Sequence, residues 1–187
     1  MFGNILHFVL TILFTLLGAA LLVRAWMYAI RLHPFNPYSQ AIFKVTDWLV
    51  QPVRRVFTPG KYLDWPSLVA AYVTALVFLL VSYVLYTGQL PVPEGWLRAL
   101  AAALLTVLKW SFNLVLWVTL IQAVLSWVNP MAPAMPVLQT LTAPLLDPIR
   151  RILPNLGGLD LSPLVLLILA QVAMMVLENV AFNLFGV

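Results

Sequence analysis

Four stretches of the chain are apolar over the length of a membrane-spanning helix, and polar residues separate them. The spans that they predict cover about residues 5–30, 66–87, 109–128 and 162–184. About 20 apolar residues suffice to cross ~30 Å of hydrocarbon at ~1.5 Å per residue. The pattern therefore predicts an all-α membrane protein with four transmembrane helices.

The stretch Leu97–Leu108 is also apolar, but it is only 12 residues long and follows the chain-breaking Pro91 and Pro93. A run of this length is too short to cross a bilayer. Two interpretations stay open: an interfacial helix, or the first part of a long and tilted third span. A fifth crossing is not predicted.

The first and third connections between the spans have a helical period of their own. In the first, apolar residues recur every three or four positions over 41–57, and polar residues do the same over 40–55. This pattern is typical of an amphipathic helix that lies in the headgroup plane. The third connection keeps it over 137–152, where Pro144 and Pro148 are expected to kink or interrupt the helix.

The two halves of the chain repeat one another at an offset of 96 residues. Pro52–Val56 reads PVRRV, and Pro148–Ile152 reads PIRRI. Leu63-Asp64 returns as Leu159-Asp160, each followed by a Ser/Pro pair and a span. These ordered matches predict a tandem duplication, with one repeat over residues 1–93 and another over 94–187. Because each repeat contains two spans, the repeats must enter the membrane in the same sense and are parallel.

The basic residues predict the orientation of the spans. Seven of the ten Lys and Arg residues lie in the first and third connections: Arg31, Lys44, Arg54, Arg55, Lys61, Arg150 and Arg151. By the positive-inside rule these connections are cytoplasmic, so both termini are predicted to be periplasmic. The expected location is the bacterial inner membrane.

Composition narrows the function classes. With 63% hydrophobic and only 9% charged residues, the chain does not resemble a soluble globular enzyme. It has no cysteine, and its two histidines, His7 and His33, are predicted near opposite membrane faces, so no metal or cofactor site is expected. No catalytic motif is present, which predicts a protein that is not an enzyme. The net charge of +4 indicates contact with anionic lipid headgroups rather than nucleic acid.

The arginine pairs Arg54-Arg55 and Arg150-Arg151 are the most distinctive polar features of the connections. One interpretation is that they anchor the topology beside anionic lipid headgroups. The other is that they pair with Asp64 and Asp160, or with an acidic group on a partner. The aspartates have a second candidate role, because each stands just before a span, where Asp64, Asp160 and Ser162 fit helix capping.

The remaining polar side chains are expected to be structural. Arg24 lies near the inner end of the first span, where its side chain is expected to snorkel toward the headgroups. Lys109 and Glu178 are predicted at similar depth near the outer interface, which suggests an ion pair. Small residues at Ser67, Ala71 and Ala75 predict close packing of the second span.

Several of these motifs resemble the YggT family of integral membrane proteins. The resemblance rests on residues 36–40 (NPYSQ), on Lys44-Val45-Thr46, on the two arginine motifs and on residues 157–163 (GGLDLSP), and it covers nearly the whole chain. The first repeat departs from the second at residues 58–62. The resemblance implies a small bacterial inner-membrane protein. Bacterial members are associated with tolerance of osmotic stress, and chloroplast members with haem attachment to a cytochrome complex and with nucleoid distribution.

The predicted function is a non-enzymatic scaffold or assembly factor linked to membrane or osmotic stress. Its cytoplasmic amphipathic face would recruit an unknown membrane protein partner. The rival is an oligomeric channel or transporter subunit for an ion or osmolyte, in which Asn113, Gln122 and Gln171 line a path. A homo-oligomer fits either function, and a third alternative is a protein that only organises lipid.

Overall fold

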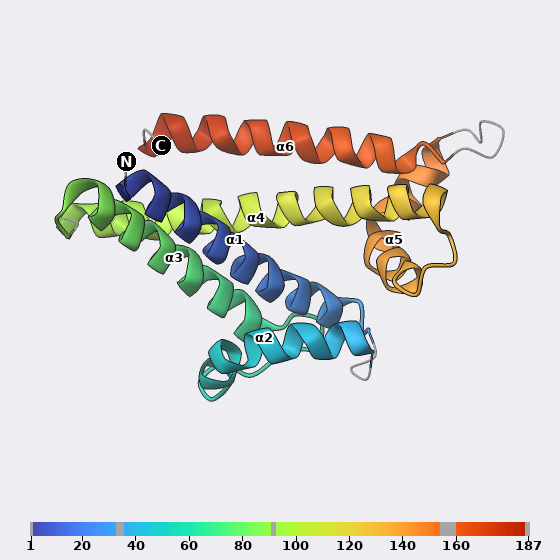
Figure 1. Cartoon of the computed structure of the whole chain (residues 1–187), viewed down its shortest axis with the longest axis horizontal. Helices are drawn as coiled ribbons and strands as arrows, with labels where there is room; N and C mark the ends of the chain where they lie inside the picture. The colour runs from blue at the N-terminus through green and yellow to red at the C-terminus, as the bar shows by residue number, and fades with distance from the viewer. Residues whose placement is uncertain (1, 33–35, 91–92, 154–159, 186–187) are drawn as a thin grey trace. The chain divides into compact units, whose positions relative to one another are not determined.

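The computed structural model describes residues 2–32, 36–90, 93–153 and 160–185. These residues form helices and short connections without any strand (Figure 1). The helices are α1 (Phe2–Ala29), α2 (Pro37–Arg54), α3 (Trp65–Thr87), α4 (Pro93–Val128), α5 (Met135–Ile152) and α6 (Ser162–Phe185). Four of them, α1, α3, α4 and α6, are long and apolar enough to cross a membrane. The predicted all-α fold with four spans is therefore confirmed, while His33 and residues 157–159 of the family motif lie outside the described residues.

The third span begins earlier than the predicted residue 109. Helix α4 runs for 36 residues without a break, so Leu97–Leu108 is the first part of this helix and not a separate interfacial one. Pro93 stands at its start, where a proline is tolerated because the first helical N–H groups need no helical acceptor. At ~1.5 Å per residue such a helix is about 54 Å long, which exceeds the ~30 Å hydrocarbon thickness.

The connections between the spans contain the expected amphipathic helices, α2 and α5. An interruption of α5 was among the expectations, but this helix continues through both Pro144 and Pro148. Both prolines are exposed and lie four residues apart, on one side of the helix. Each proline leaves a carbonyl group one turn earlier without a helical N–H partner. These carbonyl groups lie on the exposed side of α5, where the helix tolerates the loss.

The helices group into two compact units. The first comprises Met1–Ser111 with Val180–Val187, and the second comprises Phe112–Asn179. Helices α1, α2 and α3 belong to the first unit and α5 to the second, while α4 and α6 contribute to both. This division differs from the two sequence repeats, and the repeats over 1–93 and 94–187 stay a prediction.

Helices α1 and α3 pack side by side in the first unit, and α2 lies across their ends (Figure 1). The small residues Ser67, Ala71 and Ala75 of α3 are all 0% exposed, which confirms their predicted role in close packing. The arrangement places α2 at the end of the unit that carries most of its basic residues.

Gly18 of α1 meets the middle of α4 at the ring of Trp110. A Cβ atom on Gly18 would lie 2.2 Å from Cε3 of that ring, far inside van der Waals contact. The ring of Phe78 in α3 lies 6.4 Å from Trp110 and 5.6 Å from Phe14, measured between ring centroids. Gly18 therefore makes room for an aromatic layer that joins three helices of the first unit.

Candidate functional site

Arg24 is the centre of a buried polar cluster in the first unit. Its side chain is only 3% exposed, and its Nη1 donates to Oγ1 of Thr46 at 2.8 Å and to Oδ1 of Asp47 at 2.7 Å. The guanidinium carbon also lies 4.8 Å from the ring centroid of Phe43. The expectation that Arg24 snorkels to the headgroups is wrong, because α2 covers the end of α1 and supplies the partners of the charge.

Asp64, immediately before α3, supplies the second acidic group of the cluster and is 1% exposed. Its Oδ2 lies 3.8 Å from Nε of Arg24 and 3.9 Å from Nη2 of Arg54, and it accepts a hydrogen bond from Oγ of Ser67. Asp64 occupies the N-cap position of α3, but its carboxylate accepts no capping hydrogen bond from the helix backbone. The carboxylate faces the two arginines instead.

We refer to Arg24, Thr46, Asp47 and Asp64 as the Arg24 cluster. It joins α1, α2 and the start of α3, and its central pair, Arg24 and Asp64, is withdrawn from solvent, whereas Asp47 is 41% exposed. Two of its buried polar atoms, Nε of Arg24 and Oδ1 of Asp64, have no hydrogen-bond partner among the described residues. Because unpartnered buried charge is costly, the cluster is stable only while both signs of charge are present.

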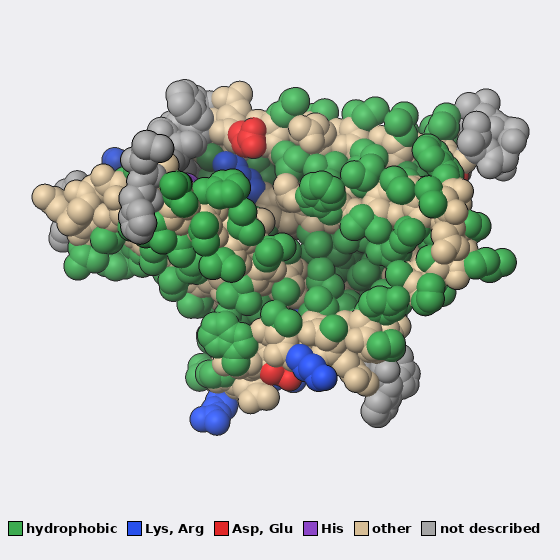
Figure 2. Space-filling model, viewed as in Figure 1, with side chains coloured by type: hydrophobic (Ala, Val, Ile, Leu, Met, Phe, Trp, Pro, Cys, Tyr) green, Lys and Arg blue, Asp and Glu red, His purple; other side chains and the backbone are tan. Residues whose placement is uncertain are grey.

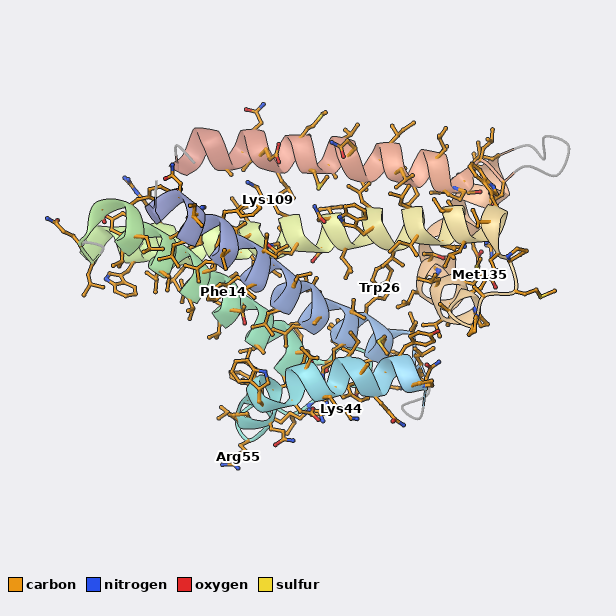
Figure 3. The ribbon with its side chains drawn as sticks, viewed as in Figure 1. Phe14, Trp26, Lys44, Arg55, Lys109 and Met135 are labelled. Carbon is orange, nitrogen blue, oxygen red and sulfur yellow. The ribbon has the colours of Figure 1, made fainter. Side chains whose placement is uncertain are left out.

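The two arginines at the end of α2 have different environments. Arg54 reaches Asp64 at 3.9 Å, whereas Arg55 is exposed and forms no ion pair with the described residues. Lys44 is likewise exposed and without an ion pair in that part of the chain. Figure 3 shows Lys44 and Arg55 on the side of α2 that faces away from α1 and α3. Arg54 thus has an acidic neighbour within the fold, whereas Arg55 is exposed without one among the described residues.

The second unit repeats this division of roles. Arg150 contacts Asp160 through Nη2 at 2.8 Å and through Nε at 2.9 Å, and it also pairs with Asp147 at 3.1 Å. Arg151 is exposed and has no ion pair within the described residues. The first arginine of each pair, Arg54 or Arg150, therefore contacts the aspartate that lies ten residues later in the chain.

Asp160 also binds the start of α6. Its Oδ1 accepts hydrogen bonds from the backbone N–H of Ser162, at 2.9 Å, and from the hydroxyl of that residue. Partial burial raises the pKa of Asp160, but the hydrogen bonds from Ser162 and the charge of Arg150 outweigh it, so the pKa lies below its ordinary value of 3.8.

A pH dependence follows from the lowered pKa of Asp160. The folded state stabilises the ionised form of Asp160 more than the unfolded state does. The contribution of this carboxylate to the free energy of unfolding is therefore complete above its unfolded pKa. It is lost as the pH falls from about 4 through the lower folded pKa. We expect Asp160→Asn to remove this part of the acid sensitivity, measured as the melting temperature of wild type and variant between pH 3 and pH 7. An equal slope for both proteins over that range would contradict it.

A second buried pair, which the sequence analysis missed, lies in the second unit. Oγ1 of Thr142 in α5 donates to Oε1 of Gln122 in α4, and both side chains are buried. Thr142 lies 96 residues after Thr46, whose hydroxyl contacts Arg24. The repeat offset was therefore a signal that could have identified both threonines. The threonine of α2 thus contacts the charged guanidinium of Arg24 in the first unit, whereas the threonine of α5 contacts the uncharged amide of Gln122 in the second.

The predicted pair of Lys109 and Glu178 joins residues that belong to different units. Lys109 belongs to the first and Glu178 to the second, and their ion pair stays a prediction.

The outer side of α2 exposes apolar as well as basic side chains. Val45 is 55% exposed and Trp48 is 63% exposed, and they lie on one stripe of the helix at a spacing of three. Figure 2 shows charged side chains over α2, whereas hydrophobic side chains dominate the surface over α1 and α3. We call Lys44, Val45, Trp48 and Arg55 the outer face of α2. It combines apolar contact area with two cations that have no ion pair in the described part of the chain.

These features define an all-α, multi-pass membrane protein with basic amphipathic helices between its spans. The family model of CCB3/YggT matches the chain over residues 3–85 and 101–181. The chain belongs to this family.

Bacterial relatives match over most of their length. The chain is 38% identical over 170 residues to the uncharacterized protein YggT of Escherichia coli K12, covering 90% of this chain and 87% of that one. It is 36% identical over 172 residues to an uncharacterized protein in the proC 3′ region of Vibrio alginolyticus, covering 91% of each. The protein PA0392 of Pseudomonas aeruginosa is 32% identical over 167 residues. No solved structure matches the chain.

Proposed function

We propose that this protein is a non-enzymatic scaffold or assembly factor of the bacterial inner membrane. Its basic connections would face the cytoplasm and bind a partner there, in support of tolerance to osmotic stress. The observation that carries the proposal is the outer face of α2, where exposed Val45 and Trp48 lie beside cations that are not neutralised within the described residues. The bacterial members that the chain resembles supply the link to osmotic stress.

The Arg24 cluster gives this face its rigidity. Arg24 ties α2 to α1 through Thr46 and Asp47, and Asp64 ties the same arginine to the start of α3. A helix fixed on its inner side loses little further conformational freedom when a partner binds its outer side. This is the physical requirement of a scaffold, which must present its contact residues in one arrangement.

The chemistry of the outer face specifies the kind of partner. Trp and Arg are the side chains that dominate binding energy in protein interfaces, because they combine large contact area with directed hydrogen bonds. Arg55 offers forked donors that suit a carboxylate. The expected partner is therefore a membrane or membrane-associated protein with an acidic group beside an apolar surface.

The rival function, a channel or transporter subunit, needs polar groups of the spans to line a path. Gln122 is one of the three candidates for this role, and it is buried and accepts a hydrogen bond from Thr142 within the second unit. A side chain engaged in this way supports packing of α5 on α4, and this contact favours the scaffold.

Arg55 and Arg151, the exposed arginine of each pair, provide a test of the proposed scaffold function. We expect the double variant Arg55→Glu and Arg151→Glu to fail to restore growth at high osmolarity in cells that lack the protein. Each change should weaken partner binding by roughly tenfold or more, the loss typical of an interface residue that contributes above ~1.4 kcal/mol. The protein should still insert and fold, because neither side chain has an ion pair among the described residues. Growth of the strains is compared at equal amounts of protein in the membrane.

Two matched controls accompany the double variant. Arg98→Glu makes the same charge change at an exposed position of α4 and should leave growth unchanged. Arg55→Lys with Arg151→Lys retains the charge and should retain most of the activity. Normal growth of the double glutamate variant would contradict a partner-binding role for Arg55 and Arg151.

A further inference from the structure

Two cations in the first unit converge on one aromatic ring. The guanidinium carbon of Arg31 lies 5.3 Å from the ring centroid of Tyr62, and Nζ of Lys61 lies 5.4 Å from it. The residues come from the two sides of α2, because Arg31 lies between α1 and α2 and Lys61 lies between α2 and α3. All three side chains are exposed, and neither cation has an ion pair in the part of the chain that the structure describes. The two cations thus share one ring, and neither is compensated by an acidic side chain among the described residues.

The backbone at Arg31 is strained. Its φ angle is +55°, the left-handed conformation, and no other non-glycine residue described in this chain has a positive φ. The N–H of Arg31 donates to the carbonyl of Tyr28 at 3.0 Å, and the next N–H, of Leu32, donates to that of Met27 at 2.9 Å. These bonds form the C-terminal cap of α1, where glycine is the usual residue. An arginine at such a position indicates that its side chain has a use there.

The loop that carries Lys61 is held against α1. The hydroxyl of Tyr28 donates to the carbonyl of Gly60 at 2.8 Å, and the N–H of Gly60 donates to that of Leu63 at 2.9 Å. The indole of Trp65 also packs at this turn, since a Cβ on Gly60 would lie 3.3 Å from its Nε1. The turn that precedes Lys61 and Tyr62 is therefore fixed against α1, the helix that Arg31 follows.

We propose that Arg31 and Lys61 form a binding site for the phosphate group of an anionic phospholipid, with Tyr62 as the surface that holds both cations. A phosphate group accepts hydrogen bonds from an arginine fork and from an ammonium group, and its negative charge compensates the two cations. The inference is independent of the partner-binding role of the outer face of α2.

The surroundings of the two cations indicate a lipid rather than a free phosphate. Leu63 is 46% exposed and Trp65 is 50% exposed, so apolar surface for an acyl chain lies next to the phosphate-binding groups. Tryptophan is also typical of the membrane interface, where its ring sits at headgroup level. At the offset of 96 residues the sequence has Gly157 in place of Lys61, so the site is specific to the first half of the chain.

Native mass spectrometry of the full chain, released from detergent with added lipid, measures this binding. We expect phosphatidylglycerol to remain bound in preference to phosphatidylcholine, and the bound fraction to fall several-fold in Arg31→Gln with Lys61→Gln. The control Lys44→Gln with Arg55→Gln removes the same charge from the outer face of α2 and should bind as the wild type does. An equal loss in both double variants, or no preference of the wild type for phosphatidylglycerol, would overturn the site.

Two further measurements complete this test. Inorganic phosphate in excess should not displace the lipid, and displacement would assign the site to free phosphate instead. Arg31→Gly relieves the backbone strain, so it should raise the melting temperature while lowering the bound lipid fraction. A purely structural role of Arg31 predicts unchanged lipid binding by this variant, which would contradict the proposal even if the double variant fails to fold.

Discussion

Replacing Arg24 by alanine is expected to lower the free energy of unfolding by about 3–5 kcal/mol, the loss seen when one partner of a buried ion pair is removed. The substitution leaves Asp64, only 1% exposed, without its central cation, and it releases Thr46 and Asp47 of α2 as well. Chemical unfolding of the purified protein in detergent, followed by the fluorescence of its tryptophans, measures the loss.

Two further variants isolate the cause of this loss. Arg54→Ala removes a cation that is 42% exposed and 3.9 Å from the same carboxylate, so it should cost less than about 1 kcal/mol. Arg24→Ala combined with Asp64→Ala should be more stable than Arg24→Ala alone, because no buried charge is then left unpaired. If Arg24→Ala costs no more than Arg54→Ala, the Arg24 cluster does not hold α2 in place.

Gly18→Ala is the second substitution with a large expected effect. The added methyl group would lie 2.2 Å from the ring of Trp110, so the ring or one of the helices must move. Overpacking of this kind costs about 1–3 kcal/mol. Unfolding measured in the same detergent tests this expectation, and Gly3→Ala is the matched control, since a Cβ at Gly3 of the same helix meets nothing within 4 Å.

A double-mutant cycle with Trp110 tests the contact itself. In a Trp110→Leu background the ring is absent, and Gly18→Ala should then cost little, because alanine is a better helix former than glycine. An equal cost of Gly18→Ala with and without the Trp110 ring would show that the two residues do not meet as the structure places them.

The length of the apolar stretches was sufficient to predict the spans, and hydrophobic periodicity was sufficient to predict the amphipathic helices. Both signals are local, since a span needs only length and apolarity, and α2 shows its period within its own 18 residues. The internal match at an offset of 96 residues singled out an arginine pair and an aspartate in each half as candidates for ion pairing. The structure shows this pairing, because Arg54 and Arg150 each contact the aspartate ten positions later. The alternatives for those aspartates, capping or pairing, could not be decided without coordinates.

The burial of Arg24 could not be predicted in the same way. A lone arginine near the end of a span normally reaches the headgroups. Its actual environment depends on α2 folding back over the end of α1, which places Thr46 and Asp47 beside it. The sequence left Leu97–Leu108 open between an interfacial helix and the first part of the third span, and the structure shows the second, because α4 begins at Pro93 and continues to Val128.

The two halves of the chain differ in the partners and the burial of their polar residues. The polar partner of Thr46 is the charged Arg24, and the partner of Thr142 is the neutral Gln122. Asp64 is buried, whereas Asp160 is 43% exposed. The outer face also differs, since positions 140 and 144 carry Thr and Pro where the first half has Lys44 and Trp48. We therefore expect the first half to contribute more of the partner-binding surface.

The most direct test of the central claim, that the outer face of α2 binds a protein partner, is photo-crosslinking from this face in living cells. A benzoylphenylalanine at position 48 replaces the exposed Trp48 with a side chain of similar bulk. The scaffold function predicts an adduct of defined mass between this protein and one other protein, formed under high osmolarity and reduced by Arg55→Glu. Adducts to lipid alone, or to a second copy of this chain alone, would contradict it.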